Sequence, residues 1–176
     1  MSIFIDLIQS LFIRGSMIAV MMTLTVSMND ALYQKMNQAN TKAHVGIVGD
    51  MLYTDLTQAG YNAPTPAFLT ASESDIKFQG DLDNDSTSET IRYYTALDAN
   101  TGLYKLYRTV NGGTPLPVGK KFNSVTFQYY NVKGKITSTL SEIAAVRVNV
   151  VEGIEGTTTG GFTTASMNFK IYPSNL

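Results

Sequence analysis

The sequence predicts an α+β fold in which one long N-terminal α-helix packs on an antiparallel β-sheet. Two observations support this prediction. Residues 2–62 contain no proline and space their apolar side chains as a helix does, whereas residues 75–176 consist of short segments rich in Val, Ile, Thr, Tyr and Phe. Because short connections join these segments, hairpins in meander order are favoured over parallel crossovers.

The predicted helix begins with an apolar run, "SIFIDLIQSLFIRGSMIAVMMTLTVSM" (residues 2–28), whose only charged side chains are Asp6 and Arg14. About 20 apolar residues are enough to cross a bilayer. Three roles are compatible with this run: a cleaved signal peptide, a plain membrane anchor, or a helix that moves from a membrane into a protein assembly. Each charge costs roughly 2.5 to 3.5 kcal/mol near the bilayer centre, so both are expected to have partners, which favours the third role.

The helix is expected to continue well beyond the apolar run. The Gly, Asn and two Pro of "AGYNAPTP" (residues 59–66) predict its end near residue 62. A helix of about 60 residues would be roughly 90 Å long. Its second half carries an apolar stripe at steps of mostly three and four, which is expected to pack across the sheet. The stripe consists of Leu32, Met36, Ala39, Ala43, Val48, Leu52, Leu56 and Ala59.

Six segments after the helix are predicted to be strands because β-branched and aromatic residues fill them and turn residues separate them. The turns include "LDNDS", "DANTG" and "NGGTP". The predicted strands are "SDIKFQG", "ETIRYYTAL", "GLYKLYRTV", "NSVTFQYYNVKG", "IAAVRVNVVEG" and "FTTASMNFKIY".

The chain is expected to divide into an apolar helix and one domain. Residues 1–30 form the hydrophobic helix, suited to a membrane or to the core of an assembly. Residues 31–176 form a globular domain, with the helix continuing to about residue 62 and the sheet spanning 75–176. The length of 176 residues suits one domain with an appendage better than two domains.

The composition excludes several classes of function. The 13 basic and 14 acidic residues are scattered and give a net charge of -1, so no basic face is expected and nucleic acid is not an expected partner. The absence of cysteine excludes disulfides, zinc-thiolate sites and thiol catalysis, but it does not decide the cellular compartment.

The order of these segments resembles the type IV pilin superfamily, and the pattern is most similar to the larger minor pilins and pseudopilins. The resemblance covers nearly the full chain. It rests on the apolar helix, its amphipathic continuation and several local phrases. These phrases are "DLTQAGYN", "FQGDLDNDSTSETIRYYT", "LYKLYRTVNGG", "VTFQYYNVKGK" and "IAAVRVNVVE".

The resemblance implies a structural subunit of a helical filament that forms a homo-oligomer through its N-terminal helix. Such a subunit waits in the inner membrane, is assembled by a pilus or secretion machinery, and is then exposed as an extracellular filament at the cell surface. A low-copy minor pilin or pseudopilin is an alternative within the superfamily. A membrane-anchored binding module is an alternative outside it.

The resemblance also implies a role for Asp6 in assembly. If Met1 is removed, Asp6 becomes the fifth residue, where pilins carry a glutamate. The acid is then expected to pair with the terminal ammonium of a neighbouring subunit or with a neighbour's Arg14. The alternative is that the Arg14 side chain extends to the membrane surface and Asp6 lies near a water interface. The chain departs from the pilin pattern in having Asp in place of Glu, a basic residue at Arg14, and no leader ending in Gly before an aromatic residue at the expected junction.

The segment "DLDNDSTSE" resembles the first half of a calcium loop, because hard cations prefer carboxylate oxygens at such spacing. Its candidate ligands are Asp81, Asp83, Asp85 and Glu89. A serine and an arginine stand where an EF-hand has its Gly and its final Glu. The favoured interpretation is a solvated turn without a cofactor, and the alternative is a calcium ion that holds an exposed hairpin.

Two further segments and the single histidine are assigned no chemical role. "GGTPLPVGKK" (residues 112–121) has the wrong spacing for a phosphate loop and is predicted to be a surface turn. His44 is expected on the helix surface, and residues 153–164 are expected to form a hairpin loop.

Because no nucleophile, base and orienting group occur together, an enzyme is not expected.

Overall fold

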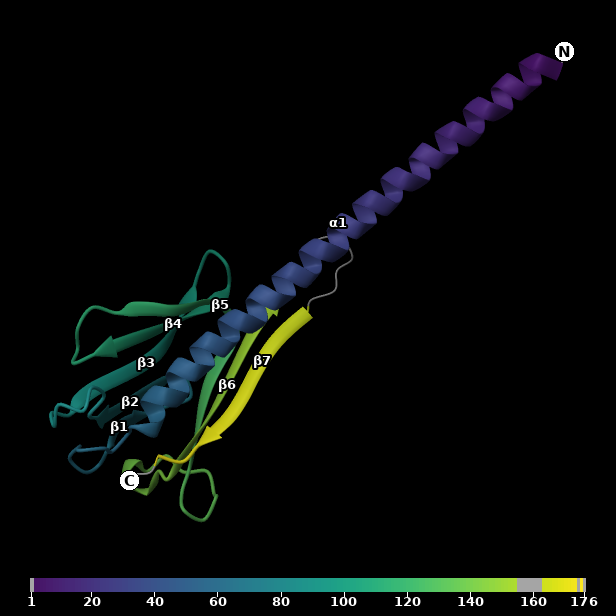
Figure 1. Ribbon diagram of the computed structural model, residues 1–176. Helices are drawn as coiled ribbons and strands as arrows, with labels where there is room; N and C mark the ends of the chain where they lie inside the picture. The colour runs from purple at the N-terminus through teal and green to yellow at the C-terminus, as the bar shows by residue number, and fades with distance from the viewer. Residues whose placement is uncertain (1, 155–162, 174, 176) are drawn as a thin grey trace.

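A computed structural model of the protein describes residues 2–154, 163–173 and 175. It contains one long helix, α1, followed by a seven-stranded antiparallel sheet, which confirms the α+β fold (Figure 1). Residues 155–162, which make up most of the predicted loop at 153–164, lie outside the described residues. The elements are α1 (Ser2–Thr57), β1 (Phe68–Ala71), β2 (Asp75–Gly80), β3 (Glu89–Asp98), β4 (Leu103–Val110), β5 (Leu116–Tyr130), the 3₁₀ turn η1 (Leu140–Glu142), β6 (Ala145–Ile154) and β7 (Thr163–Ile171).

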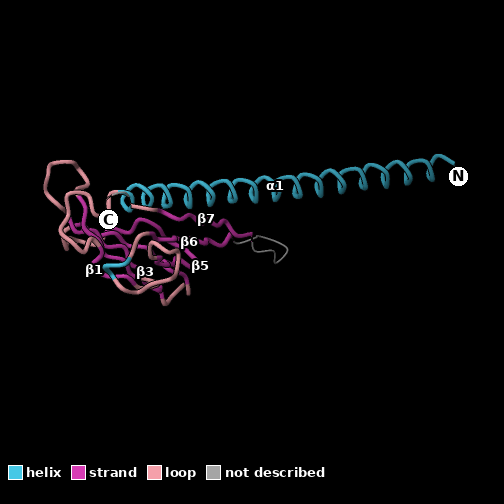
Figure 2. The backbone as a smooth tube through the Cα atoms, turned by 90° about the horizontal axis from the view of Figure 1, so that it is seen from below, coloured by secondary structure: helices cyan, strands magenta, loops and turns pink. Residues whose placement is uncertain are grey.

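Helix α1 is continuous, and its N-terminal part projects far from the sheet (Figure 2). It ends at Thr57, about a turn before the predicted end, and residues 58–62 form turns. Gly60 and Asn62 there have φ angles of 86° and 49°. These left-handed conformations end helices and are adopted most easily by glycine and asparagine.

Every strand pairs with the next one along the chain, so the sheet has the predicted meander order. The long strand β5 joins its two parts. Residues 116–122 of β5 pair with β4, and residues 122–130 pair with β6. The register shifts on both sides of Phe122, and the neighbouring Lys121 has a φ of 69°. Such irregularities increase bending and twist, which lets the sheet curl.

Two strand segments were not predicted. Strand β1 adds residues 68–71 to the sheet, and residues 116–121 belong to β5 although they were predicted to be a surface turn. β1 has only four residues, too few for a clear alternation. In β5, Pro117 pairs with Tyr107 beside a register shift, where the lack of a proline N–H is tolerated.

The C-terminal part of α1 packs across β5, β6 and β7 and closes the core. Val48, Leu52 and Leu56 of the predicted stripe have no exposed surface. The earlier stripe residues, from Leu32 to Ala43, are exposed, because the sheet does not extend that far along the helix. The other large, fully buried core side chains are Tyr93, Phe68, Phe78, Phe122, Ile76, Ile91, Leu106, Ile171 and Val146.

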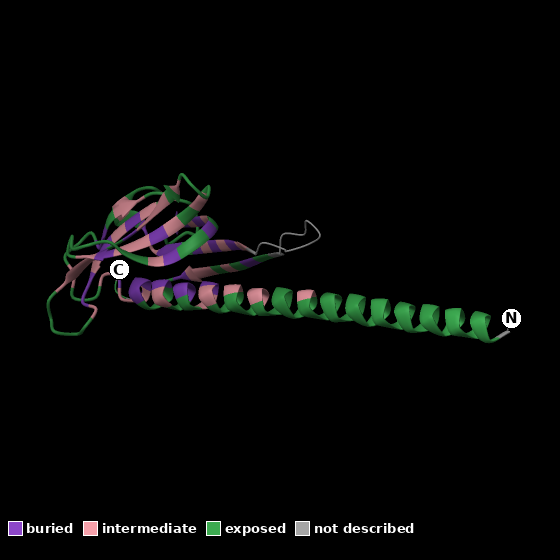
Figure 3. Cartoon of the chain, turned by 90° about the horizontal axis from the view of Figure 1, so that it is seen from above, coloured by how far each residue is buried: buried purple, intermediate pink, exposed green. Residues whose placement is uncertain are grey.

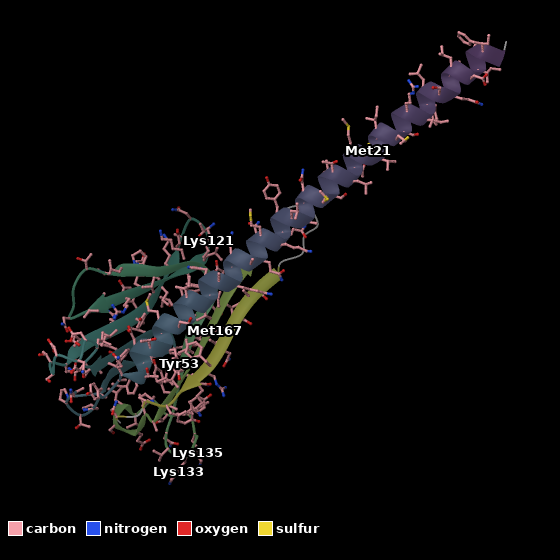
Figure 4. All side chains as sticks on the ribbon, in the orientation of Figure 1. Met21, Tyr53, Lys121, Lys133, Lys135 and Met167 are labelled. Carbon is pink, nitrogen blue, oxygen red and sulfur yellow. The ribbon has the colours of Figure 1, made fainter. Side chains whose placement is uncertain are left out.

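Two glycines allow close approach between α1 and the sheet. A Cβ atom on Gly49 would collide with the sulfur of Met167 in β7. Figure 4 shows Met167 on β7, beside the helical stretch that carries Tyr53. A Cβ atom on Gly80 would collide with the backbone of Gln58, just after α1. Gly80 therefore brings the end of β2, and the acidic turn that follows it, under the C-terminal end of the helix.

Candidate functional site

The first half of α1, residues 3–28, exposes a large apolar surface, and we call it the apolar half. All its side chains are exposed (Figure 3). Ile3 is 83% exposed and Phe12 is 78% exposed. Figure 4 shows Met21 of this half standing clear of the sheet. A continuous apolar surface of this kind marks a site for lipid or for another protein. Its other large exposed apolar residues are Phe4, Ile5, Leu7, Ile8, Leu11, Ile13, Met17, Ile18, Val20, Met22, Leu24, Val26 and Met28.

This helix is long and apolar enough to cross a membrane. The assessment rests on length and composition, and the helix lies near the N-terminus, where a signal sequence meets the same criteria. The apolar half is therefore an N-terminal hydrophobic helix that could span a membrane or act as a signal sequence.

Several polar side chains of the apolar half have their hydrogen bonds within the helix itself. The hydroxyl of Ser16 donates to the carbonyl oxygen of Ile13 at 2.8 Å. The hydroxyls of Thr23 and Thr25 donate in the same way to carbonyls one turn earlier, each at 2.9 Å. These hydroxyls can therefore enter an apolar environment without leaving a donor unpaired.

The two charged side chains of the apolar half have no partner within the helix. Asp6 and Arg14 are exposed, and neither forms an ion pair with any other described residue. They are eight positions apart in sequence, about 12 Å along a helix, which prevents direct contact between them. The structure thus does not bring the two predicted assembly residues together within one chain.

The acidic turn after β2 brings three of the four predicted metal ligands together. Asp81, Asp83 and Glu89 each offer a carboxylate oxygen, and these oxygens lie within 4.8 Å of one another. Asp85 is not part of this group. Its side chain accepts a hydrogen bond from the backbone N–H of Thr87 at 2.7 Å. Three carboxylates at this separation would suit a hard cation such as calcium.

Protein donors already bind the central carboxylate of this turn. Asp81 is 1% exposed and accepts hydrogen bonds from Asn62 Nδ2 at 3.0 Å and from the backbone N–H groups of Ser86 and Asp85 at 3.0 and 3.1 Å. The hydrogen bond from Asn62, assisted by the backbone donors, lowers the pKa of Asp81. The turn is therefore held by its own hydrogen bonds, and a cation would have to compete with them.

A buried polar cluster attaches α1 to the far strands of the sheet. The Asp55 carboxylate on α1 accepts hydrogen bonds from the Tyr93 hydroxyl of β3 at 2.6 Å and from Arg108 Nε of β4 at 2.7 Å. Burial, reinforced by Asp55, raises the pKa of Tyr93. Burial opposes the charge of Arg108, but the hydrogen bond and charge of Asp55 outweigh it and raise the pKa of Arg108. The cluster fixes the helix against the sheet.

Sequence reasoning missed this cluster. An isolated acid on a helix usually indicates a solvated surface, so Asp55 was not predicted to be buried. The available signal was its position between Leu52 and Leu56, three residues after one stripe member and one before the next. An acid on a buried stripe requires a partner from the opposing layer.

His44 lies where α1 meets the edge of the core. Its ring stacks on Phe122, with centroids 5.5 Å apart and the ring planes 5° from parallel. Its Nδ1 atom lies 2.6 Å from Glu152 Oε2 in β6. His44 is half-buried and paired, so its packing role is greater than the helix-surface position predicted from the sequence.

No protein-family model matches the chain, and no curated protein matches it in sequence. The similarity of this chain to pilins therefore rests on its architecture. An N-terminal hydrophobic helix whose second half packs on an antiparallel sheet is a pilin-like arrangement.

Proposed function

We propose that this protein is the structural subunit of a type IV pilus-like filament and that it assembles through the apolar half of α1. The observation that carries the proposal is the division of one helix. One face of residues 45–57 is buried in the core, whereas residues 3–28 present apolar side chains to the exterior all around the helix. A helix that is apolar on all sides is suited to a membrane or to the centre of a bundle.

The proposed role has two stages. Before assembly the apolar half lies in the inner membrane, and the sheet domain lies outside the bilayer. During assembly a pilus or secretion machinery transfers the chain, and copies of the same helix replace lipid around the apolar half. The sheet domains then face outward along an extracellular filament at the cell surface. The role is structural, and no catalytic step is proposed.

Several features are compatible with both stages. The hydroxyls of Ser16, Thr23 and Thr25 are bonded within the helix, so they suit lipid and a helical bundle equally. Asp6 and Arg14 are unpaired in the described chain, and a neighbouring copy would supply partners that lipid does not offer.

Electron microscopy of material sheared from cells that express the chain tests this proposal. We expect filaments that antibodies against the sheet domain label along their whole length.

Two other outcomes would favour the alternatives. Labelling restricted to one end of a filament would indicate a low-copy minor pilin or a pseudopilin. Chain that remains monomeric in the membrane fraction, with no filaments in the sheared material, would contradict the proposal and favour a membrane-anchored binding module.

A further inference from the structure

The sheet curls so that the turn between β1 and β2 reaches strand β5. The carbonyl oxygen of Ser74 in this turn accepts a hydrogen bond from the backbone N–H of Thr95 in β3 at 3.0 Å, and that of Glu73 accepts one from Phe127 in β5 at 2.9 Å. β4 pairs with β5 no further than Phe122, so the next part of β5 pairs only with β6. The surface beside the turn is therefore hollowed.

Two adjoining hollows lie there, and we call them together the polar groove. They measure about 490 and 310 Å³, and Glu73 and Thr126 line both. Hollows of this size hold small ligands, and two that share lining residues can hold a ligand with several units in a row. The larger one is also lined by Arg147, Asn149 and Asn168, and the smaller one by Thr95, Tyr104 and Asn123.

The groove opens on the face of the sheet that is turned away from α1. Along β5, Thr126 lies between Val125 and Phe127, which belong to the core under the helix. Side chains alternate between the two faces of a strand, so Thr126 and its partners in register, Asn149 and Asn168, lie on the opposite face. Figure 3 shows α1 along one side of the sheet. The helix therefore does not cover the groove.

The polar side chains of the groove have unused hydrogen-bonding groups. Asn149 and Asn168 form no side-chain hydrogen bond with any other described residue. The guanidinium of Arg147 lies over the ring of Tyr130, 5.2 Å from its centre, and pairs with no described acid. The Glu73 carboxylate pairs with no described base. A ligand can bond these groups without displacing a protein partner.

The chemistry of these groups specifies the ligand. Among the described residues that line the groove, Arg147 is the one base and Glu73 the one acid, so a net charge on the ligand is not favoured. The amides of Asn149 and Asn168 both donate and accept hydrogen bonds, as the hydroxyl groups of a saccharide do. Tyr104, which is 36% exposed, offers an aromatic face to the apolar side of a sugar ring. The groove therefore suits a neutral, polyhydroxylated ligand.

An extended peptide suits the groove less well. Addition of a peptide strand requires a sheet edge with free consecutive backbone groups. On β5 the N–H of Phe127 already bonds Glu73, and the carbonyl oxygen of Tyr129 accepts a hydrogen bond from the N–H of Thr137 at 3.1 Å. A peptide strand would have to break both bonds.

We infer that the polar groove binds a short neutral oligosaccharide, with one sugar ring on Tyr104 and the hydroxyls of another bonded to Asn149, Asn168 and Arg147. Carbohydrate binding is a function beyond the proposed filament role. The inference does not rest on assembly, because the residues that carry it all belong to one chain.

Ligand-observed NMR with the whole chain tests this inference. The chain is held in micelles of a phosphocholine detergent, which carries no sugar. The probes are neutral tetrasaccharides, namely cellotetraose, maltotetraose, mannotetraose and tetra-N-acetylchitotetraose. Tetragalacturonate and a hexapeptide of threonine and serine represent the acidic saccharides and the peptides. We expect saturation transfer to at least one neutral probe and a weaker response from the other two.

Variants in each hollow locate the binding site. Tyr104→Ala and Asn168→Ala should each weaken binding of the neutral probe about tenfold, as the loss of one favourable contact does. Tyr104→Phe keeps the aromatic face and should bind as the natural chain does. The matched controls are Tyr172→Ala and Asn100→Ala, at exposed positions outside the groove, and they should leave binding unchanged. Melting temperatures equal to that of the natural chain show that each variant is folded.

Three results would overturn the inference. The first is an absence of binding to every neutral probe. The second is tighter binding of tetragalacturonate or of the hexapeptide than of any neutral probe, which would assign the groove to a different ligand. The third is an equal effect of the groove variants and their controls, which would place the saccharide elsewhere on the chain. Each result leaves the filament proposal to be decided by microscopy of the sheared material.

Discussion

The two halves of α1 are built from similar apolar residues but have opposite surroundings. Leu52 in the second half has no exposed surface, whereas Leu24 in the first half is 64% exposed. The second half finds its partners in β5, β6 and β7 of the same chain. The first half projects beyond the sheet and finds none among the described residues (Figure 3).

This difference indicates that the second half of α1 serves folding and the first half serves association with other molecules. The second half, through Val48, Leu52 and Leu56, belongs to the core and determines whether the domain folds. The first half adds no contact to that core, so its apolar surface must be covered from outside the chain. The comparison predicts that the two halves respond differently to substitution, and the following predictions run from the largest expected effect to the smallest.

Deleting residues 3–28 should have the largest effect, because it removes the whole uncovered surface and leaves the core intact. The shortened chain should move entirely from the membrane fraction to the soluble fraction and keep a cooperative thermal transition. Fractionation and circular dichroism measure these properties. A shortened chain that aggregates or shows no transition would mean that the apolar half is needed for folding.

Leu52→Ala in the shortened chain should lower the free energy of unfolding by about 2 to 5 kcal/mol, because it opens a cavity in a closed core. Ile47→Ala is the matched control, since Ile47 lies on the same half of α1 but is 64% exposed. It should change the free energy by less than about 0.5 kcal/mol. Urea denaturation measures both, and equal losses would contradict the assignment of the buried face.

Asp55→Asn should lower the free energy of unfolding by about 1 to 3 kcal/mol, because the buried hydrogen bonds from Tyr93 and Arg108 lose their charged acceptor. Asp50→Asn, at an exposed position of the same helix, is the matched control and should have little effect. If the two variants unfold at the same urea concentration, the Asp55 cluster does not fix the helix on the sheet.

Asp81 should make stability dependent on pH in the acid range. The pKa of Asp81 is lower in the folded chain than its ordinary value, so the folded state favours the ionised carboxylate. Its contribution is present above the unfolded pKa of about 3.9 and is lost as pH falls through the lower folded pKa. Asp81→Asn should therefore melt below the natural chain near neutral pH, and the gap should close in strong acid. A gap that does not vary with pH would contradict this sign.

Calcium should have the smallest effect, because hydrogen bonds already occupy the oxygens of Asp81. A site with a dissociation constant near 1 mM would contribute only about 0.4 kcal/mol at 1 mM calcium. Calorimetry of the shortened chain should show at most a slight rise in melting temperature, which Asp83→Asn removes. A large rise that depends on Asp83 and Glu89 would show a strong metal site instead.

Much of the fold could be predicted from the sequence because its periodicity is clear. The helical spacing up to residue 57 and the alternation in the six longer strands specify both layers. β1 and residues 116–121 of β5 were missed because their strand structure depends on pairing with distant residues. A four-residue segment and a segment with proline carry too little local signal to show that pairing.

The candidate site was only partly predictable. The exposed apolar half and its two charges follow from composition. The grouping of Asp81, Asp83 and Glu89 follows from their spacing, although the same spacing also suggested Asp85, which lies outside the group. The partners of Asp55 did not follow, because they come from strands 38 and 53 positions away in the sequence, and Glu152, the partner of His44, lies 108 positions away. Only the packing of α1 across the curled sheet brings these residues together.

The accessibility of a single thiol on each half of α1 tests the central claim most directly. Val20→Cys reports on the apolar half, and Ile47→Cys reports on the exposed face of the second half. Both chains are isolated as lipid-free sheared material and treated with a water-soluble maleimide. If copies of the chain cover the apolar half, Ile47→Cys is labelled and Val20→Cys is protected until the filament is dissociated in detergent. Equal labelling of both thiols in intact material would contradict the account, because the apolar half would then lie open to water.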